Sequence, residues 1–266
     1  MVANQLNIEE LLHQASQLYT RRVLGKALAI AKEALHLSKE EPFIEGMQAA
    51  HLLLGKINST AGHYQGDAAA FEKALEHLQE AKELQAKEIG ISLDLEITLT
   101  QGQVLRYQMA HEQAIQHFQE ALASPRNKEI AAQVKLCCAL SQVYISKNAF
   151  DKALESASKA KKLLIEKEDK AETLQIEVYH QLAHIFIRKR QQYAKILSYS
   201  EKVLAYSQRE GDVEKELRAL NNIAIVHGVQ SDYKSAMQYF LEELDKSKAV
   251  RYHFNIAQCL INIGTI

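Results

Sequence analysis

Small residues recur along this 266-residue chain at a nearly constant interval, each within an amphipathic helical pattern. They are Ala15, Gly55, Gly102, Ser141, Ala183, Ala224 and Gly264, with successive gaps of 40, 47, 39, 42, 41 and 40 residues. A second series follows at a distance of 12 in four of six cases, and comprises Ala27, Ala74, Ala114, Ala153, Ile196 and Ala236. Such a period is typical of repeat architectures, in which each unit is one supersecondary element that cannot bury its apolar face alone.

The stretch from Leu136 to Leu164 illustrates one unit. Its first half carries apolar residues three and four apart, a spacing that predicts a helix with one apolar face. After a turn at residues 146–148, the second half carries Phe150 and a series of alanines that let another helix approach closely. This pattern therefore predicts a helix-turn-helix unit, which must pack against neighbouring units to bury its apolar faces.

Two units depart from the common spacing. The distance between the two small residues is 19 in the second unit and 13 in the fifth, which predicts insertions in the turns after Lys56 and after Arg188. The sequence STAGHYQGD, which begins at Ser59, contains two glycines and interrupts the periodicity. We therefore expect a surface loop there, since insertions in loops cost little.

Three segments carry a family resemblance: GQVLRYQMAHEQAIQHFQEAL from Gly102, LSQVYISKNAFDKALESASKA from Leu140 and LNNIAIVHGVQSDYKSAMQYF from Leu220. They resemble tetratricopeptide repeats, although these units run to about 40 residues where the usual repeat has ~34, and most helix-ending prolines are missing. Longer repeats of this kind are similar to those of kinesin light chain, of cell-polarity adaptors and of bacterial peptide-pheromone receptors. The resemblance implies an all-α, right-handed α-α superhelix of about six repeats plus an incomplete seventh, forming a single domain over residues 1–266.

The composition of the chain excludes several classes of function. Lys and Arg total 32 against 33 Asp and Glu, and no region is basic enough for nucleic-acid binding. The chain has no run of ~20 apolar residues and no signal-peptide pattern at its start, so we expect a soluble, cytoplasmic protein that does not bind membranes. Its three cysteines, Cys137, Cys138 and Cys259, are badly spaced for disulfides and should be reduced.

Catalytic signatures are missing from the sequence, which contains no GxGxxG, GxxxxGK[ST], HExxH, GxSxG or CxxC pattern. His180 and His184 are four residues apart and would share one helical face, as metal ligands often do. Two ligands do not make a metal site, and a polar pair lining a groove is the simpler interpretation. We expect a non-catalytic region without a metal or another cofactor.

Stacked first helices turn the same face inward, so residues three before, one after and four after each small residue should line a concave groove. These positions hold Leu99, Gln103, Arg106, Cys138, Gln142, Ile145, His180, His184, Ile187, Asn221 and Ile225. The adjoining turns add Tyr107, Lys135, Arg188 and Arg218. The predicted peptide-binding groove consists of the polar and aromatic members of this set: Gln103, Arg106, Tyr107, Lys135, Gln142, His180, His184, Arg188, Arg218 and Asn221.

Asn221 carries a further resemblance. The LNNIA sequence around it is similar to first helices of kinesin light chain and the pheromone receptors, which implies that its amide contacts the backbone of a bound peptide. A carboxamide can donate and accept hydrogen bonds at once. The alternative is that Asn221 or Asn222 satisfies a neighbouring helix end.

These features predict a scaffold that binds a protein or peptide. The resemblance implies the sensory or regulatory region of a bacterial signalling protein, with this chain as its N-terminal part and an adenylate or guanylate cyclase or another output domain following. The alternative is a stand-alone regulator similar to the peptide-pheromone receptors. Residues Phe254–Ile266 read as an apolar helix that no second helix covers, and we expect either a homodimer through this surface or fraying of this helix.

Overall fold

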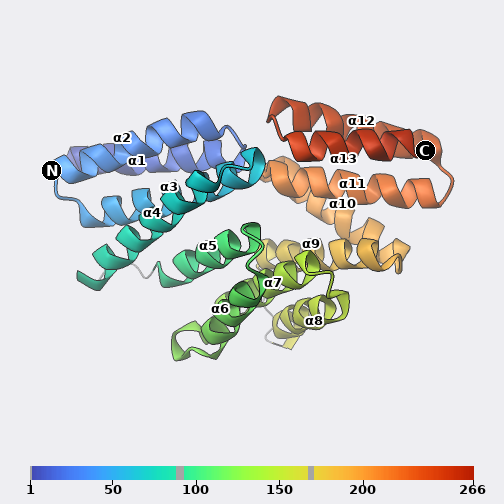
Figure 1. Cartoon of the computed structure of the whole chain (residues 1–266), viewed down its shortest axis with the longest axis horizontal. Helices are drawn as coiled ribbons and strands as arrows, with labels where there is room; N and C mark the ends of the chain where they lie inside the picture. The colour runs from blue at the N-terminus through green and yellow to red at the C-terminus, as the bar shows by residue number, and fades with distance from the viewer. Residues whose placement is uncertain (1, 88–92, 167–170) are drawn as a thin grey trace. The chain divides into compact units, whose positions relative to one another are not determined.

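The computed structural model describes residues 2–87, 93–166 and 171–266, and these residues form thirteen α-helices, one short 3-10 helix and no strand. The α-helices are α1 (Val2–Thr20), α2 (Leu24–Glu40), α3 (Ile44–Gln65), α4 (Ala68–Lys87), α5 (Asp94–Tyr107), α6 (His111–Ala123), α7 (Ile130–Ser146), α8 (Phe150–Glu166), α9 (Glu172–Lys189), α10 (Tyr193–Glu210), α11 (Val213–Val229), α12 (Tyr233–Ala249) and α13 (His253–Gly264) (Figure 1). The 3-10 helix η1 (Pro125–Asn127) follows α6. All thirteen positions of the two series fall inside α-helices, in the predicted order of first and second helices.

The chain divides into two compact units, residues 1–117 and 118–266. In the first unit, α1 packs on α2 and α3 on α4, and the first helices α1, α3 and α5 contact one another in sequence order. The second unit repeats this arrangement with the pairs α7 with α8, α9 with α10 and α11 with α12, and with contacts from α7 to α9 and from α9 to α11. Each unit is thus a stack of helix pairs. The expectation of one domain remains a prediction.

The small residues allow close approach between the two helices of a pair. Ser141 of α7 is fully buried, and its hydroxyl donates a hydrogen bond to the backbone oxygen of Ala153 in α8 at 3.0 Å. At Gly55 of α3, an added Cβ atom would lie 2.9 Å from the side chain of Leu78 in α4. A larger residue at either position would push the two helices apart, which explains why the first series is restricted to Gly, Ala and Ser.

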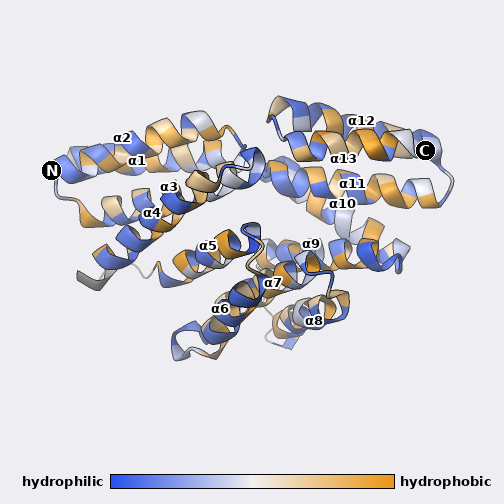
Figure 2. Ribbon diagram, viewed as in Figure 1, coloured by the Kyte–Doolittle hydropathy of each residue, from blue (hydrophilic) through white to orange (hydrophobic). Residues whose placement is uncertain are grey.

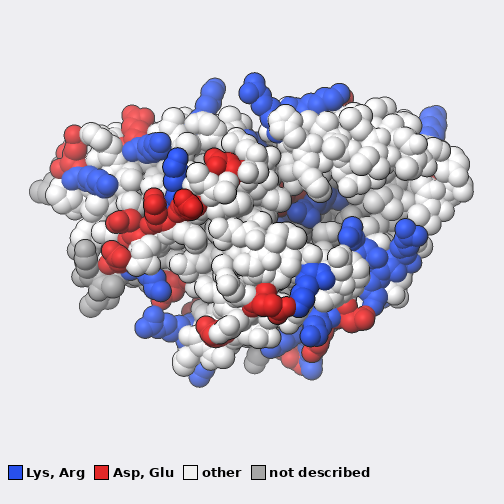
Figure 3. All heavy atoms as spheres, in the orientation of Figure 1, with Lys and Arg blue, Asp and Glu red and all other residues white. Residues whose placement is uncertain are grey.

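The apolar core runs along each stack as a chain of three-helix junctions. One cluster joins Ile176 of α9, Val203 of α10 and Ala219 of α11, which are 4%, 1% and 1% exposed. Hydrophobic and hydrophilic residues accordingly share most helices (Figure 2). Acidic and basic side chains both occur on the face drawn in Figure 3, separated by wide uncharged areas, in keeping with a net charge of −1.

The predicted loop after Ser59 is wrong. Residues Ser59–Gln65 continue α3, and Gly66, with a φ of 69°, ends the helix. Gly62 is buried where an added Cβ atom would lie 2.9 Å from the Phe71 ring of α4, so this glycine serves helix packing rather than a turn. The extra residues of the second unit lengthen both α3 and α4.

Candidate binding site

The ten predicted groove residues all lie on first helices, including Tyr107, Lys135, Arg188 and Arg218, which the sequence predicts in the adjoining turns. Gln103, Arg106 and Tyr107 belong to α5 in the first unit, and the other seven belong to α7, α9 and α11 in the second. Of the wider set, Cys138, Ile145 and His180 are only 1%, 7% and 7% exposed, so these three side chains pack mainly inside the repeats. Whether the ten bind a peptide remains a prediction.

In the first unit the three predicted residues meet around Tyr107. The Gln103 amide donates to the Tyr107 hydroxyl at 2.7 Å, and the Arg106 guanidinium lies 4.3 Å from the centre of the tyrosine ring. His63 of α3 stacks on the same ring, with centroids 4.0 Å apart and planes 8° from parallel. These contacts fix the Tyr107 ring between two helices.

In the second unit a charged cluster joins α9 to α11. Lys215 of α11 lies 2.6 Å from the carboxylate of Asp212 and 3.6 Å from that of Glu177 in α9. Burial alone would lower the pKa of Lys215, but these two carboxylates outweigh it and raise that pKa, so the ammonium keeps its charge. Arg218 lies 3.5 Å from Glu214 one helical turn earlier.

His180 is the neutral member of this cluster. Burial lowers the pKa of its imidazole to about 4, and the nearby positive charge of Arg218 acts in the same direction. Our sequence prediction included His180 and Arg218 but missed Glu177 and Lys215. A signal was available for Glu177, because it lies six residues before Ala183, as Arg218 lies six before Ala224.

Asn221 has a structural partner. Its amide donates to the side chain of Glu243 in α12 at 3.0 Å, and Asn255 of α13 donates to the other oxygen of that carboxylate at 2.9 Å. Glu243 is fully buried, and its burial raises the pKa of the carboxyl although both amide bonds oppose the rise. Asn221 therefore stabilises its own repeat, whereas its contact with a bound peptide remains a prediction.

A metal site finds no support in the described part of the chain, where no group of three or more His, Cys, Asp or Glu side chains could hold an ion. His180 and His184 both lie on α9. None of the described helices is long and apolar enough to cross a membrane.

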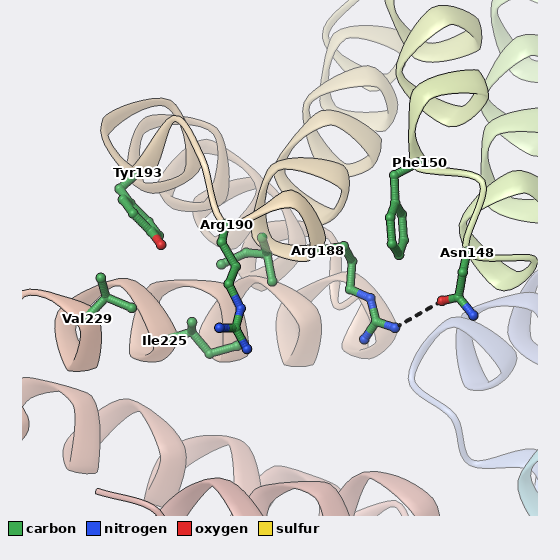
Figure 4. Close-up of a pocket in the computed structure, with 8 residues that line it drawn as sticks. Asn148, Phe150, Arg188, Arg190, Tyr193, Ile225 and Val229 are labelled. Atoms are coloured by element: carbon green, nitrogen blue, oxygen red, sulfur yellow. Dashed lines mark hydrogen bonds between the residues drawn. The ribbon is translucent and has the colours of Figure 1, made fainter.

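A cavity of about 510 Å³ lies where the turns of the second unit meet α11, and we call it the turn pocket. Eight residues line it: Asn148, Phe150, Ile187, Arg188, Arg190, Tyr193, Ile225 and Val229. Ile187 and Ile225 occupy predicted groove positions, and Arg188 is a predicted groove residue, so the pocket lies on the predicted binding face. Figure 4 shows the guanidinium groups of Arg188 and Arg190 extending toward α11.

The turn between α9 and α10 brings Arg190 to this pocket. Other turns, such as that between α7 and α8, contain a single residue in the left-handed region, Asn148 with a φ of 59°. Here Arg190 and Gln192 both adopt it, with φ values of 52° and 60°. The additional left-handed residue coincides with the 13-residue spacing of this repeat. The sequence therefore located the irregularity but not the arginine that it presents.

Comparisons with known proteins agree with this architecture. Residues 174–249 match the tetratricopeptide repeat family model, from α9 through α12. No curated protein sequence matches the chain. Residues 174–249 are therefore similar to tetratricopeptide repeats, and the all-α superhelical fold class predicted from the sequence is confirmed.

Several solved structures share the fold at low sequence identity. The Rap protein complexed with Competence and Sporulation Factor is 14% identical, with a TM-score of 0.60 over 97% of this chain and 70% of that one. The tetratricopeptide repeat sensor protein PH0952 of the Signal Transduction ATPase class, from Pyrococcus horikoshii, is 15% identical, with a TM-score of 0.62 over 98% of this chain and 37% of that one. BtubC (BKLC) from P. vanneervenii is 16% identical, with a TM-score of 0.52 over 93% and 92%. At these identities the similarity establishes the fold alone.

Proposed function

We propose that this protein is a regulatory scaffold that binds a peptide or a segment of a partner protein on the face formed by α7, α9 and α11. The observation that carries the proposal is the turn pocket, because it combines apolar residues from two successive first helices with two arginines. Repeat proteins of this class present their ligand-binding residues on one face of stacked units. Ile187, four residues after Ala183, and Ile225, one residue after Ala224, both occupy offsets expected on that face.

Two similar structures support a regulatory role. The Rap protein was solved with Competence and Sporulation Factor, and PH0952 carries its repeats as the sensor of a signal-transduction ATPase. We propose that this chain is likewise the sensory region of a longer signalling protein with an output domain, for which a nucleotide cyclase is one candidate. The alternative is a stand-alone regulator that responds to a signalling peptide. Sequencing the coding frame beyond Ile266 separates the two: a continuing frame that encodes an output domain favours the first, and an immediate stop codon favours the second.

The binding proposal is tested by selecting a displayed library of random dodecapeptides against the full chain. We expect peptides that enrich over bare support and whose affinity, measured by fluorescence anisotropy, falls at least about tenfold with Ile225→Lys. The matched control is Leu241→Lys, which changes an aliphatic residue of α12 that is 46% exposed. Absence of enrichment, or equal losses in both variants, would refute the proposed binding face.

A homodimer through Phe254–Ile266 is a second proposal. On α13, Phe254, Leu260 and Ile261 are 68%, 53% and 61% exposed. Large apolar side chains grouped in this way are commonly covered by association. The cytoplasmic location stays a prediction.

A further inference from the structure

The two arginines of the turn pocket differ in how they are held. The Arg188 guanidinium donates a long hydrogen bond of 3.5 Å to the Asn148 side chain and lies 5.7 Å from the centre of the Phe150 ring. The Arg190 side chain forms neither a hydrogen bond nor an ion pair with any residue in the described ranges, and it is exposed. The pocket therefore offers one oriented and one unused guanidinium group.

The carboxylate of Asp151 does not neutralise these arginines. Asp151 follows Phe150 at the start of α8, and its carboxylate pairs with Lys189 at the end of α9. None of the eight residues that line the turn pocket is an Asp or a Glu. The local charge at the pocket is positive, and guanidinium groups bind planar carboxylates with particular preference because two N–H groups can match two oxygens.

The rest of the pocket is apolar. Ile187, Ile225 and Val229 provide aliphatic surface, and the Tyr193 and Phe150 rings stand at its two ends (Figure 4). Val229 is 53% exposed, so its surface is left in contact with water. The volume of about 510 Å³ lies within the range of about 300–1,000 Å³ that small-ligand sites occupy.

We infer that the turn pocket binds an amphipathic carboxylate, in which one carboxylate is joined directly to a branched aliphatic or aromatic body. The carboxylate lies between Arg188 and Arg190, and the apolar body lies against Ile187, Ile225 and Val229. This chemistry has two sources, a free small carboxylic acid and the C-terminal residue of a peptide. The inference rests on the proposed function only in treating the pocket as part of the binding face.

The test is a titration of the methyl-labelled full chain followed by NMR. The probes are N-acetyl-leucine and its neutral analogue N-acetylleucinamide, which differ only in the carboxylate. We expect the acid to shift the methyl signals of Ile187, Ile225 and Val229 saturably, with a dissociation constant of about millimolar order for so small a ligand. The amide should bind at least about tenfold more weakly, since a charge-assisted hydrogen bond is lost.

Variants assign the effect to the pocket. Arg190→Gln should weaken binding of the acid about tenfold and leave binding of the amide unchanged. Lys202→Gln is the matched control, because Lys202 lies on α10 against the Tyr179 ring and does not line the pocket. Equal binding of acid and amide, or equal affinity of the acid for parent and Arg190→Gln protein, would overturn the inference.

Two further probes separate the sources. A pentapeptide of four alanines ending in a free leucine that binds at least about tenfold more tightly than 4-methylpentanoate indicates a peptide C-terminus, and equal affinities indicate a free acid. Failure of this inference is distinguishable from failure of the proposed function. Equal binding of acid and amide, together with library-selected peptides that still lose affinity with Ile225→Lys, would remove the carboxylate site and keep the scaffold. Conversely, the acid titration measures binding in the pocket even if no library peptide enriches.

Discussion

Acidification should destabilise this protein through His180, whose imidazole is 7% exposed and has its pKa lowered to about 4 by burial. In the unfolded chain the same group has a pKa of 6.5. Between pH 6.5 and pH 4 the imidazole therefore binds a proton in the unfolded state but not in the folded state. The neutral imidazole contributes full stability above pH 6.5, and this contribution is lost as the pH falls from 6.5 toward 4.

The size of the effect follows from these two values. At pH 5 the unfolded imidazole is almost fully protonated and the folded one is mostly neutral. Because the pH then lies about 1.5 below the unfolded pKa, and each pKa unit corresponds to about 1.4 kcal/mol, the loss relative to pH 7 is about 2 kcal/mol. His51 in the first unit has its pKa lowered to about 4 as well, again mainly by burial, so the parent protein carries a second contribution of the same sign.

The variant His180→Gln isolates the first contribution, since it leaves His51 in place. Urea unfolding followed by circular dichroism at pH 7 and pH 5 should give a pH-dependent loss about 2 kcal/mol smaller in the variant than in the parent. The exposed His253 provides a matched control substitution, His253→Gln. NMR titration of histidine labelled at Cε1 gives an independent reading, in which Arg218→Gln should raise the His180 midpoint.

A His180 midpoint between 6 and 7, or the same pH dependence in parent and His180→Gln protein, would refute this account of the α9 and α11 cluster. Either result would mean that the imidazole is hydrated or paired with an acid, and not buried in neutral form beside Arg218.

Three further predictions concern packing. Gly55→Ala should destabilise the fold by about 1 kcal/mol, because crowding of ~1–3 kcal/mol against a buried leucine of α4 exceeds the gain in helix propensity. Gly228→Ala should stabilise it by up to ~1 kcal/mol, because an added Cβ atom there meets nothing closer than 3.9 Å. Equal unfolding midpoints for the two variants and the parent would contradict both expectations. Asn221→Leu should cost ~1–3 kcal/mol in the same urea assay, since it removes a donor from a buried carboxylate of α12, and a loss under ~0.5 kcal/mol would deny that role. Sedimentation should give a dimer for the parent and a monomer for Leu260→Glu with Ile263→Glu, and a monomeric parent would exclude the dimer.

The helices could be predicted from the sequence because the same packing constraint recurs in every repeat. Where two helices touch at Ser141 and Ala153, only a small residue fits, and its recurrence marks every helix pair. The same reasoning failed at Ser59–Gln65 because glycine has two uses. Gly62 admits the Phe71 ring, whereas Gly66 provides the left-handed end of α3, and the letters alone do not distinguish them.

The site was less predictable because periodicity specifies the direction of a side chain but not its partner. The rule that placed Gln142 and His184 in the groove also placed Cys138 and Ile145 there, and these two are buried. Neighbouring repeats bring Glu177 to Lys215 across two helices 38 residues apart in sequence, and no local pattern encodes that pair.

Pairing within the protein also decides where binding energy is available. A ligand that reaches Gln103, Lys215 or Asn221 must replace a hydrogen bond or ion pair that these side chains already make, so the net gain is small. The Arg190 side chain makes no such bond within the described chain, and its left-handed backbone ends α9 with N–H bonds to helix carbonyls. We therefore expect the groove columns to set the path and register of a ligand, and the turn pocket to be the part of the face where a new charge-assisted contact adds most to affinity.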